Sequence, residues 1–264
     1  MITSYSHGLL LMRNDRLLER SWRSDQCYKF IFSHTGKGLY EIPRGDISIG
    51  EGMFLMLNPG DPHRQLHVTD EKFLVEIDQL LVKNVCIDLG ITKTHPNFAS
   101  ISLRHPQLMQ WVSFVREFIV HSDPNERSFF LDHSMTQLVL LLMKHAPGSH
   151  QSELSIPTTL APLNNAVNAI KESFREDWTL DELAALTGLS KYQFAHAFKE
   201  SFGISPYSYL QLFRMIKSQE KLLHTTDSIL SIALSSGFKN LSSYNHLFKK
   251  LYGKTPSQVR IRHH

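Results

Sequence analysis

The sequence has few cysteines, no long hydrophobic run and no strong charge of either sign. Two cysteines, Cys27 and Cys86, exclude a disulfide framework and a cysteine-rich zinc site, and they favour a reducing cytoplasm. No stretch of about 20 apolar residues occurs, and the first residues lack a basic region followed by an apolar run, so we expect a soluble protein that is not exported. The formal net charge of +3 does not by itself indicate nucleic-acid binding.

What the sequence does have is length for two domains and an uneven distribution of charge. Its 264 residues are 42% hydrophobic, enough for two ordinary cores. Residues 161–264 carry 13 Lys and Arg against 8 Asp and Glu, a net of +5, whereas residues 1–160 carry 15 against 17, a net of −2. The segment 147–160 is polar and broken by proline. We therefore expect domains at 1–146 and 161–264, joined by a linker at 147–160.

One pattern occurs twice in the last hundred residues. Residues 194–199 (FAHAFK), followed by Gly203 and Pro206, are matched fifty positions later by residues 244–249 (YNHLFK), followed by Gly253 and Pro256. A matching short helix and turn precede each copy, at 180–189 and 229–238. The spacing predicts two helix-turn-helix motifs in an all-α domain.

Capping signals define the first motif on both sides of its turn. Thr179 with Glu182 forms a predicted capping box, Gly188 ends that helix, and Ser190 with Gln193 begins the next. Asn240 is the expected N-cap of the equivalent helix in the second motif. Apolar residues at helical spacing face the core in both copies and leave corresponding polar faces outward.

At these residues the chain resembles the AraC/XylS family of bacterial transcription regulators, over about 161–262. The resemblance implies a rigid pair of helix-turn-helix motifs whose recognition helices enter the major groove about one helical turn apart, roughly 34 Å. Carried over by position, the DNA-binding residues are Tyr192, Ala195, His196, Lys199, Ser242, Ser243, Asn245, His246 and Lys249. The lysines are expected at phosphates and the others at base edges. The alternative for each is an ordinary solvated side chain.

The region from about 25 to 80 predicts β structure, because short apolar runs at 28–32 and 53–57 alternate with glycine and proline turns. Its order of turns is similar to the cupin-type barrel that forms the sensory domain of many AraC-family proteins. The resemblance implies that Trp22, Arg23, Thr35, His63 and Gln65 line a pocket for a small-molecule effector. The alternatives are packing for Trp22, a surface charge for Arg23 and a turn-capping role for His63.

His63 and His67 also suggest a metal site, because residues four apart on a strand share a face. The signature of cupin enzymes is not met, since no glutamate follows at the expected spacing. We therefore predict no metal, no cofactor and no enzymatic activity. The alternative function is a cupin metalloenzyme or small-molecule binding protein with an attached DNA-binding module.

Residues 105–145 predict two helices, each with one apolar stripe. The second stripe consists of Phe130, Leu131, Met135, Leu138, Val139, Leu142 and Met143. By resemblance to family members with this layout, that helix pairs with its counterpart in a homodimer. The alternative is that the stripe packs on the barrel of its own chain.

Together these features predict a multidomain α and β protein: an N-terminal cupin-like β-barrel with dimerisation helices, and an all-α C-terminal domain with two helix-turn-helix motifs. The predicted function is a sequence-specific, DNA-binding transcription regulator, an activator by resemblance, controlled by an effector in the barrel. Its expected partners are double-stranded DNA, the effector, RNA polymerase and a second copy of the chain. A regulator controlled by a protein partner is a further alternative.

Overall fold

The structure, a computed structural model, describes residues 1–13, 21–68, 70–150 and 161–261. Within it the chain separates into two units, Met1–Ala146 and Pro147–His264. Most of the expected linker, residues 151–160, lies outside the described residues. No helix in the described part of the chain is both long and apolar enough to cross a membrane.

Strands dominate the first part of the N-terminal unit. They are β1 (Ile2–Tyr5), β2 (Gly8–Arg13), β3 (Tyr28–Ser33), β4 (Gly38–Ile42), β5 (Gly45–Ile49), β6 (Met53–Leu57), β7 (Arg64–Val68), β8 (Lys72–Ile77) and β9 (Ser102–Arg104). Antiparallel pairing arranges them in a six-stranded sheet, in the order β1-β2-β8-β3-β6-β9, and a three-stranded sheet, in the order β5-β4-β7.

The central strand β3 is buried on both of its faces, which explains its unbroken apolar sequence. On one face Phe30 packs against Trp111, with ring centroids 6.5 Å apart. On the other face Ile31 joins the core between the two sheets, together with Leu55, Leu57 and Leu74 of the larger sheet and Tyr40, Ile42, Ile49 and Val68 of the smaller. The larger sheet is therefore the middle layer of the unit.

The predicted β-barrel does not close. Among the described residues, hydrogen bonds join the strands into two separate sheets rather than into one ring. The edge strand β7 has β4 as its only strand partner within the described ranges, and Arg23 and His63 add one isolated bridge. The two sheets pack face to face and bury their apolar residues between them. The core therefore forms without hydrogen bonds between the edge strands of the two sheets.

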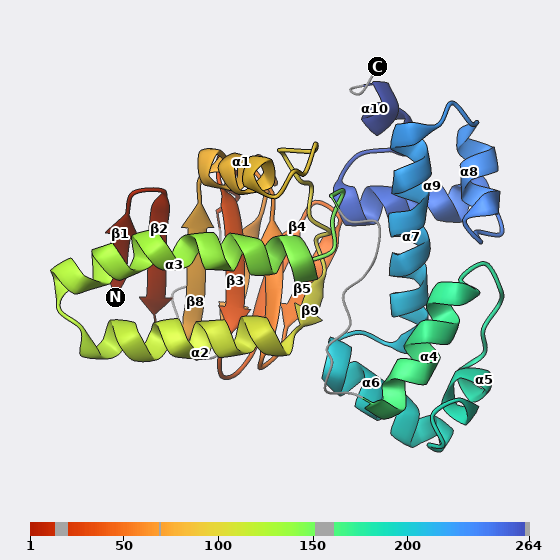
Figure 1. The fold of residues 1–264 in the computed structure, drawn as a ribbon, viewed down its shortest axis with the longest axis horizontal. Helices are drawn as coiled ribbons and strands as arrows, with labels where there is room; N and C mark the ends of the chain where they lie inside the picture. The colour runs from red at the N-terminus through yellow and green to blue at the C-terminus, as the bar shows by residue number, and fades with distance from the viewer. Residues whose placement is uncertain (14–20, 69, 151–160, 262–264) are drawn as a thin grey trace. The chain divides into compact units, whose positions relative to one another are not determined.

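Three helices complete this unit: α1 (Gln79–Asp88), α2 (Pro106–His121) and α3 (Pro124–His145). In Figure 1, α2 and α3 lie across one face of the six-stranded sheet. Both predicted apolar stripes are present. No sequence pattern predicted β1, β2, β9 or α1.

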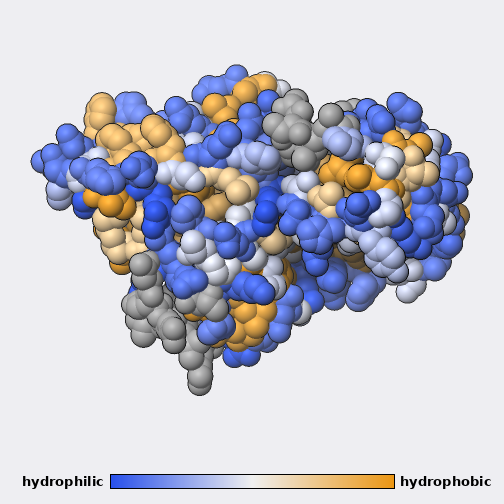
Figure 2. Space-filling model, turned by 90° about the horizontal axis from the view of Figure 1, so that it is seen from below, coloured by the Kyte–Doolittle hydropathy of each residue, from blue (hydrophilic) through white to orange (hydrophobic). Residues whose placement is uncertain are grey.

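The apolar stripe of α3 does not form an exposed dimer seam, so that part of the prediction is wrong. Leu131, Met135 and Leu138 are fully buried within their own chain, because α3 packs against α1, α2 and β1. The exposed large apolar side chains of α2 and α3 lie on other faces, at Phe114, Val120, Phe129 and Leu140. Figure 2 shows apolar surface at its left end, the end at which α2 and α3 are joined in Figure 1.

The C-terminal unit is helical throughout its described elements. They are α4 (Ala161–Glu172), α5 (Leu180–Ala185), α6 (Lys191–Phe202), α7 (Pro206–His224), α8 (Ile229–Ser235), α9 (Leu241–Tyr252) and α10 (Pro256–Ile261). Figure 1 shows α4, α5 and α6 around one end of α7, and α8, α9 and α10 around the other. The helices α5–α6 form the first helix-turn-helix motif and α8–α9 the second. The long helix α7 therefore holds the two motifs apart.

Candidate functional site

The second helices of the two motifs, α6 and α9, begin and end in the same way. The side chain of Ser190 accepts a hydrogen bond from the backbone N–H of Gln193, and Asn240 accepts one from Ser243. Each helix ends at a glycine with positive φ, 78° at Gly203 and 73° at Gly253. The predicted caps are confirmed at both motifs, and local interactions therefore fix where each helix points.

Burial along the two helices is also equivalent. Phe194 and Phe198 in α6, and Tyr244 and Phe248 in α9, are fully buried and place these helices against the core. Residues 192–200 and 242–250 have the same order of buried, half-buried and exposed side chains. The rotation of each helix about its axis is thus set by two aromatic anchors four residues apart.

The structure places most of the predicted DNA-contacting residues on these outward faces. The exposed ones are Tyr192, His196, Lys199, Ser242, Ser243, His246 and Lys249, while Ala195 and Asn245 are half-buried. Tyr192 is 86% exposed, which is unusual for an aromatic side chain without a partner surface. Such a face offers a phenol, two imidazoles, hydroxyls and ammonium groups to a ligand.

The outward side chains of α6 and α9 differ from the predicted, equivalent faces in two respects. The amide oxygen of Asn245 is buried and has no hydrogen-bond partner among the described residues, so this conformation does not present the whole carboxamide outward for a bidentate contact. In α6, His196 Nδ1 lies 3.5 Å from the Glu200 carboxylate, whereas Lys250 occupies the corresponding position of α9. The outward face of α9 is therefore the more basic of the two.

A set of contacts that no sequence pattern predicted joins the two motifs. The side chain of Arg214, on α7, is buried and donates hydrogen bonds to the carbonyl oxygens of Phe174 (2.7 Å), Arg175 (3.4 Å) and Glu176 (2.8 Å). Next to these residues, Asp177 pairs with Lys239 at 2.9 Å. The loop before α5 is thus attached both to α7 and to the turn of the second motif. An arginine in the middle of a long helix, such as Arg214, does not by itself predict such contacts.

In the N-terminal unit, the residues predicted to line an effector pocket differ in their exposure. Trp22 is 45% exposed beneath the Arg64 guanidinium, and Thr35 is exposed in a turn. His63 and Gln65 are buried. A cavity of about 10 Å³ between the sheets, the space of one water molecule, is lined by other residues, among them Ser33, Tyr40 and Lys72.

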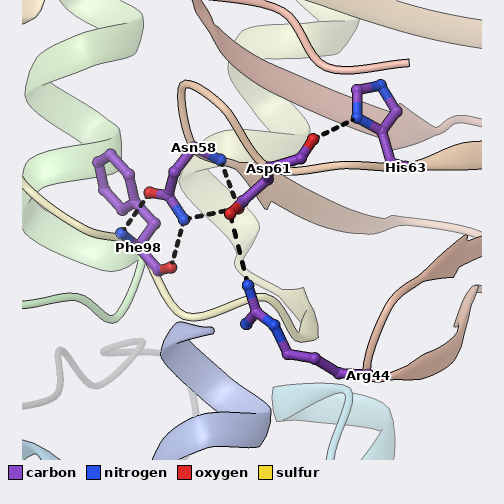
Figure 3. Close-up of polar contacts among 5 residues, drawn as sticks. All are labelled: Arg44, Asn58, Asp61, His63 and Phe98. Carbon is purple, nitrogen blue, oxygen red and sulfur yellow. Dashed lines mark hydrogen bonds and ion pairs between the residues drawn. The ribbon is translucent and has the colours of Figure 1, made fainter. Parts of the chain in front are cut away.

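Both ring nitrogens of His63 are used inside the protein. Nδ1 lies 2.9 Å from the carbonyl oxygen of Asp61, and Nε2 lies 3.3 Å from Arg23 Nε (Figure 3 shows the Asp61 contact). Because a carbonyl only accepts and the guanidinium only donates, Nδ1 carries the proton and Nε2 is the acceptor. Burial lowers the pKa of His63, which keeps the ring neutral. His63 therefore connects the residues before β3 to the β6–β7 loop.

His63 and His67 do not share a face, so the structure does not assemble the metal pair considered from the sequence. His63 is buried and His67 exposed. The pairing of β4 with β7 is irregular here, because Leu39 opposes His67 while Tyr40 opposes Gln65. Such a bulge adds a residue to one strand and reverses the alternation of side chains beyond it.

Asn58 fastens the same β6–β7 loop to the segment before β9. Its carboxamide accepts from the backbone N–H of Phe98 (2.7 Å) and donates both to the Phe98 carbonyl oxygen (3.0 Å) and to the Asp61 carboxylate (3.0 Å), as Figure 3 shows. Both Asn58 and Phe98 are buried. The carboxamide thus bonds both the N–H and the C=O of Phe98, as the backbone of a neighbouring strand would.

We expect Asn58→Ala to destabilise the N-terminal unit by about 2–3 kcal/mol, because the buried N–H and C=O of Phe98 lose their partner. Urea unfolding of the full chain, with the transition of this unit followed separately, measures the change. Asn84→Ala is the matched control, since Asn84 is exposed on α1. Equal stability of both variants would contradict a structural role for the Asn58 contacts.

Comparisons with known proteins agree with the duplicated geometry. A family described as a helix-turn-helix domain matches residues 183–262. The chain is 24% identical, over 170 residues, to the HTH-type transcriptional regulator MtrA of Neisseria gonorrhoeae; the match covers 62% of this chain and 56% of MtrA. It is 27% identical, over 175 residues, to an uncharacterized HTH-type transcriptional regulator of Haemophilus influenzae, covering 66% of this chain and 58% of that protein. The chain thus spans little more than half the length of these relatives.

Two solved structures are also similar. One is an AraC-type regulator from Chromobacterium violaceum, with 25% identity and a TM-score of 0.38, covering 40% of this chain and 94% of that one. The other is the apo form of a ToxT variant from Vibrio cholerae, with 12% identity and a TM-score of 0.38, covering 98% of each chain.

The matched residues 183–262 begin within α5 and include both recognition helices, their glycine caps and the intervening α7. The C-terminal unit thus contains a helix-turn-helix domain of the kind that this family model describes.

Proposed function

We propose that the protein is a transcription regulator that reads two blocks of base pairs with α6 and α9 on one face of double-stranded DNA. The observation that carries this proposal is the pair of equivalent outward faces at the two ends of α7. A 19-residue helix rises about 28 Å, close to the separation of about 34 Å between successive major-groove sites on one face of DNA.

The chemistry of the two faces suits DNA. Imidazole, hydroxyl and phenol groups can bond base edges, and we assign phosphate contacts to Lys199 and Lys249, which lie in the last turns of α6 and α9. The net charge of +5 over residues 161–264 supplies the attraction that non-specific binding needs. Because Lys250 replaces Glu200 at the equivalent position, we expect α9 to contribute more to affinity than α6.

Selection of random DNA duplexes by the full-length protein at moderate salt tests this proposal. We expect two enriched blocks, with centres separated by about one helical turn. The variant His196→Ala should relax base preference in one block only, by about 1–3 kcal/mol of discrimination. Lys199→Ala should instead weaken all sequences alike and reduce the salt dependence. Absence of any enrichment, together with binding that ignores sequence, would exclude the proposed function.

The remaining parts of the proposal concern the N-terminal unit and rest on family resemblance. We place the regulator in the cytoplasm, as an activator that contacts RNA polymerase and responds to a small molecule bound by a cupin-type N-terminal unit. A homodimer would use the outer apolar side chains Phe114, Phe129 and Leu140, and sedimentation at several concentrations would detect it.

A further inference from the structure

The two helix-turn-helix motifs are not equivalent at their turns. Gly188 and Gly237 occupy the same place in the duplicated pattern, and both have positive φ, 69° and 87°. A methyl group added at Gly188 would meet nothing within 4 Å. At Gly237 it would lie 2.8 Å from Arg214 Nε and 3.0 Å from Arg175 Cα. Only the second turn therefore needs glycine for close approach to another segment.

A second asymmetry lies one step further along the chain. Between the turn glycine and the N-cap, the first motif has one residue, Leu189, whereas the second has two, Phe238 and Lys239. Phe238 is buried against Tyr244, with ring centroids 5.1 Å apart, as a core residue of that motif. Lys239 is the additional residue, and its ammonium pairs with Asp177 on the loop before α5. The extra residue thus points at the first motif.

Arg214 lies between these contacts and is attached more firmly. Its side chain is 4% exposed, and three carbonyl oxygens of residues 174–176 accept its hydrogen bonds. Hydrogen bonds from a buried charged donor are stronger than neutral ones, whereas the exposed Asp177–Lys239 pair contributes little energy. The set formed by Arg214, residues 174–177, Gly237 and Lys239, here named the motif clamp, therefore depends mainly on Arg214 and on the tight packing at Gly237.

We propose that the motif clamp fixes the separation and relative orientation of α6 and α9, so that Arg214 and Gly237 are positioning residues that set which spacing between two DNA blocks the protein accepts. The inference rests on the proposed function for its DNA readout. Its physical basis is independent of DNA: α7 alone joins the motifs through one helix, which can bend, while the clamp adds a second attachment between them. Two attachments leave less freedom of relative rotation than one.

The duplication provides a matched pair of variants. Gly188→Ala and Gly237→Ala impose the same kind of strain at positive φ, but only Gly237→Ala forces the second turn away from Arg214 and the Arg175 backbone. Spin labels at Glu200→Cys and Lys250→Cys, in the full chain with Cys27→Ser and Cys86→Ala, report the distance between the equivalent ends of α6 and α9. The accepted spacing is measured separately. Affinity is compared between the selected duplex and duplexes in which the separation of the two blocks is one base pair longer or shorter.

We expect Gly237→Ala to shift or broaden the label distance and to reduce the preference for one spacing over its neighbours by about tenfold, the effect of one mismatched contact. Base preferences within each block should stay unchanged, and Gly188→Ala should alter neither readout. If folded Gly237→Ala gives the distance and spacing profile of Gly188→Ala, the proposal is overturned and Gly237 serves stability alone.

Further variants keep the test decisive if Gly237→Ala does not fold. Arg214→Lys retains the charge but cannot span three carbonyl oxygens, and Asp177→Asn removes the charge that faces Lys239. An unchanged label distance in both variants would overturn the proposal. Should the unmodified protein enrich no DNA at all, the proposed function fails, but the label distances still decide whether the clamp holds the motifs.

Discussion

Arg214→Met is expected to destabilise the C-terminal unit by about 3–5 kcal/mol, because a buried charged donor is removed and its acceptors remain. Methionine can replace the aliphatic stem of Arg214, but it offers no donor to the carbonyl oxygens of Phe174, Arg175 and Glu176. The loop before α5 would then lose its attachment to α7. Thermal or urea unfolding of the full chain, with the transition of this unit resolved, measures the loss.

Arg175→Met provides the control for this experiment. Arg175 belongs to the same loop, but its side chain is exposed, with the guanidinium 5.5 Å from the ring centroid of Phe174. We expect this variant to lose less than about 1 kcal/mol. A similar loss for both arginines would mean that general charge, and not the buried hydrogen bonds, stabilises the loop.

Acidification from pH 7.5 to 5 is expected to destabilise the N-terminal unit by about 2–4 kcal/mol through two stacked histidines. The rings of His105 and His145 lie 3.6 Å apart and are buried where α2 begins and α3 ends. Burial, the neighbouring His145 and Lys144 lower the pKa of His105 to about 3. Burial and Lys144 lower that of His145 to about 4. Protonation of both rings would place two like charges in contact.

The sign of the effect follows from the direction of both shifts. Each folded pKa lies below the ordinary value of 6.5, so the unfolded chain binds protons first as the pH falls. Stability that is fully present above pH 6.5 is therefore lost progressively below it. His105→Phe keeps a ring in the stack but cannot titrate, and it should remove about half of the loss, whereas His121→Asn, at an exposed position, should remove none. An unaltered acid dependence in His105→Phe would exclude the stacked pair as its cause.

Local signals in the sequence were sufficient to predict the helices of the two helix-turn-helix motifs. Ser190 with Gln193, and Asn240 before Ser243, act within one helical turn, and the aromatic anchors lie four residues apart. These interactions depend only on residues close in the chain, so their spacing predicts the helix and its buried face. The same holds for α2 and α3, whose stripes were predicted correctly.

Elements that depend on distant partners were missed or placed wrongly. β9 has three residues and exists through its pairing with β6, and β2 is held between β1 and β8. The alternation that put His63 and His67 on one face fails at the β4–β7 bulge. The apolar stripe of α3 fitted a dimer seam and an internal core equally well, because periodicity shows which face is buried but not what covers it.

Short-range spacing, repeated twice in the chain, was enough to predict the two helix-turn-helix motifs, their caps and their outward faces. The three-dimensional arrangement was needed to show that the two strand layers form separate sheets and that Gly237, unlike Gly188, packs against Arg214. Arg214 lies about forty residues from the carbonyl oxygens that it binds. Contacts across such a distance depend on the path of the chain between them, and no local pattern specifies that path.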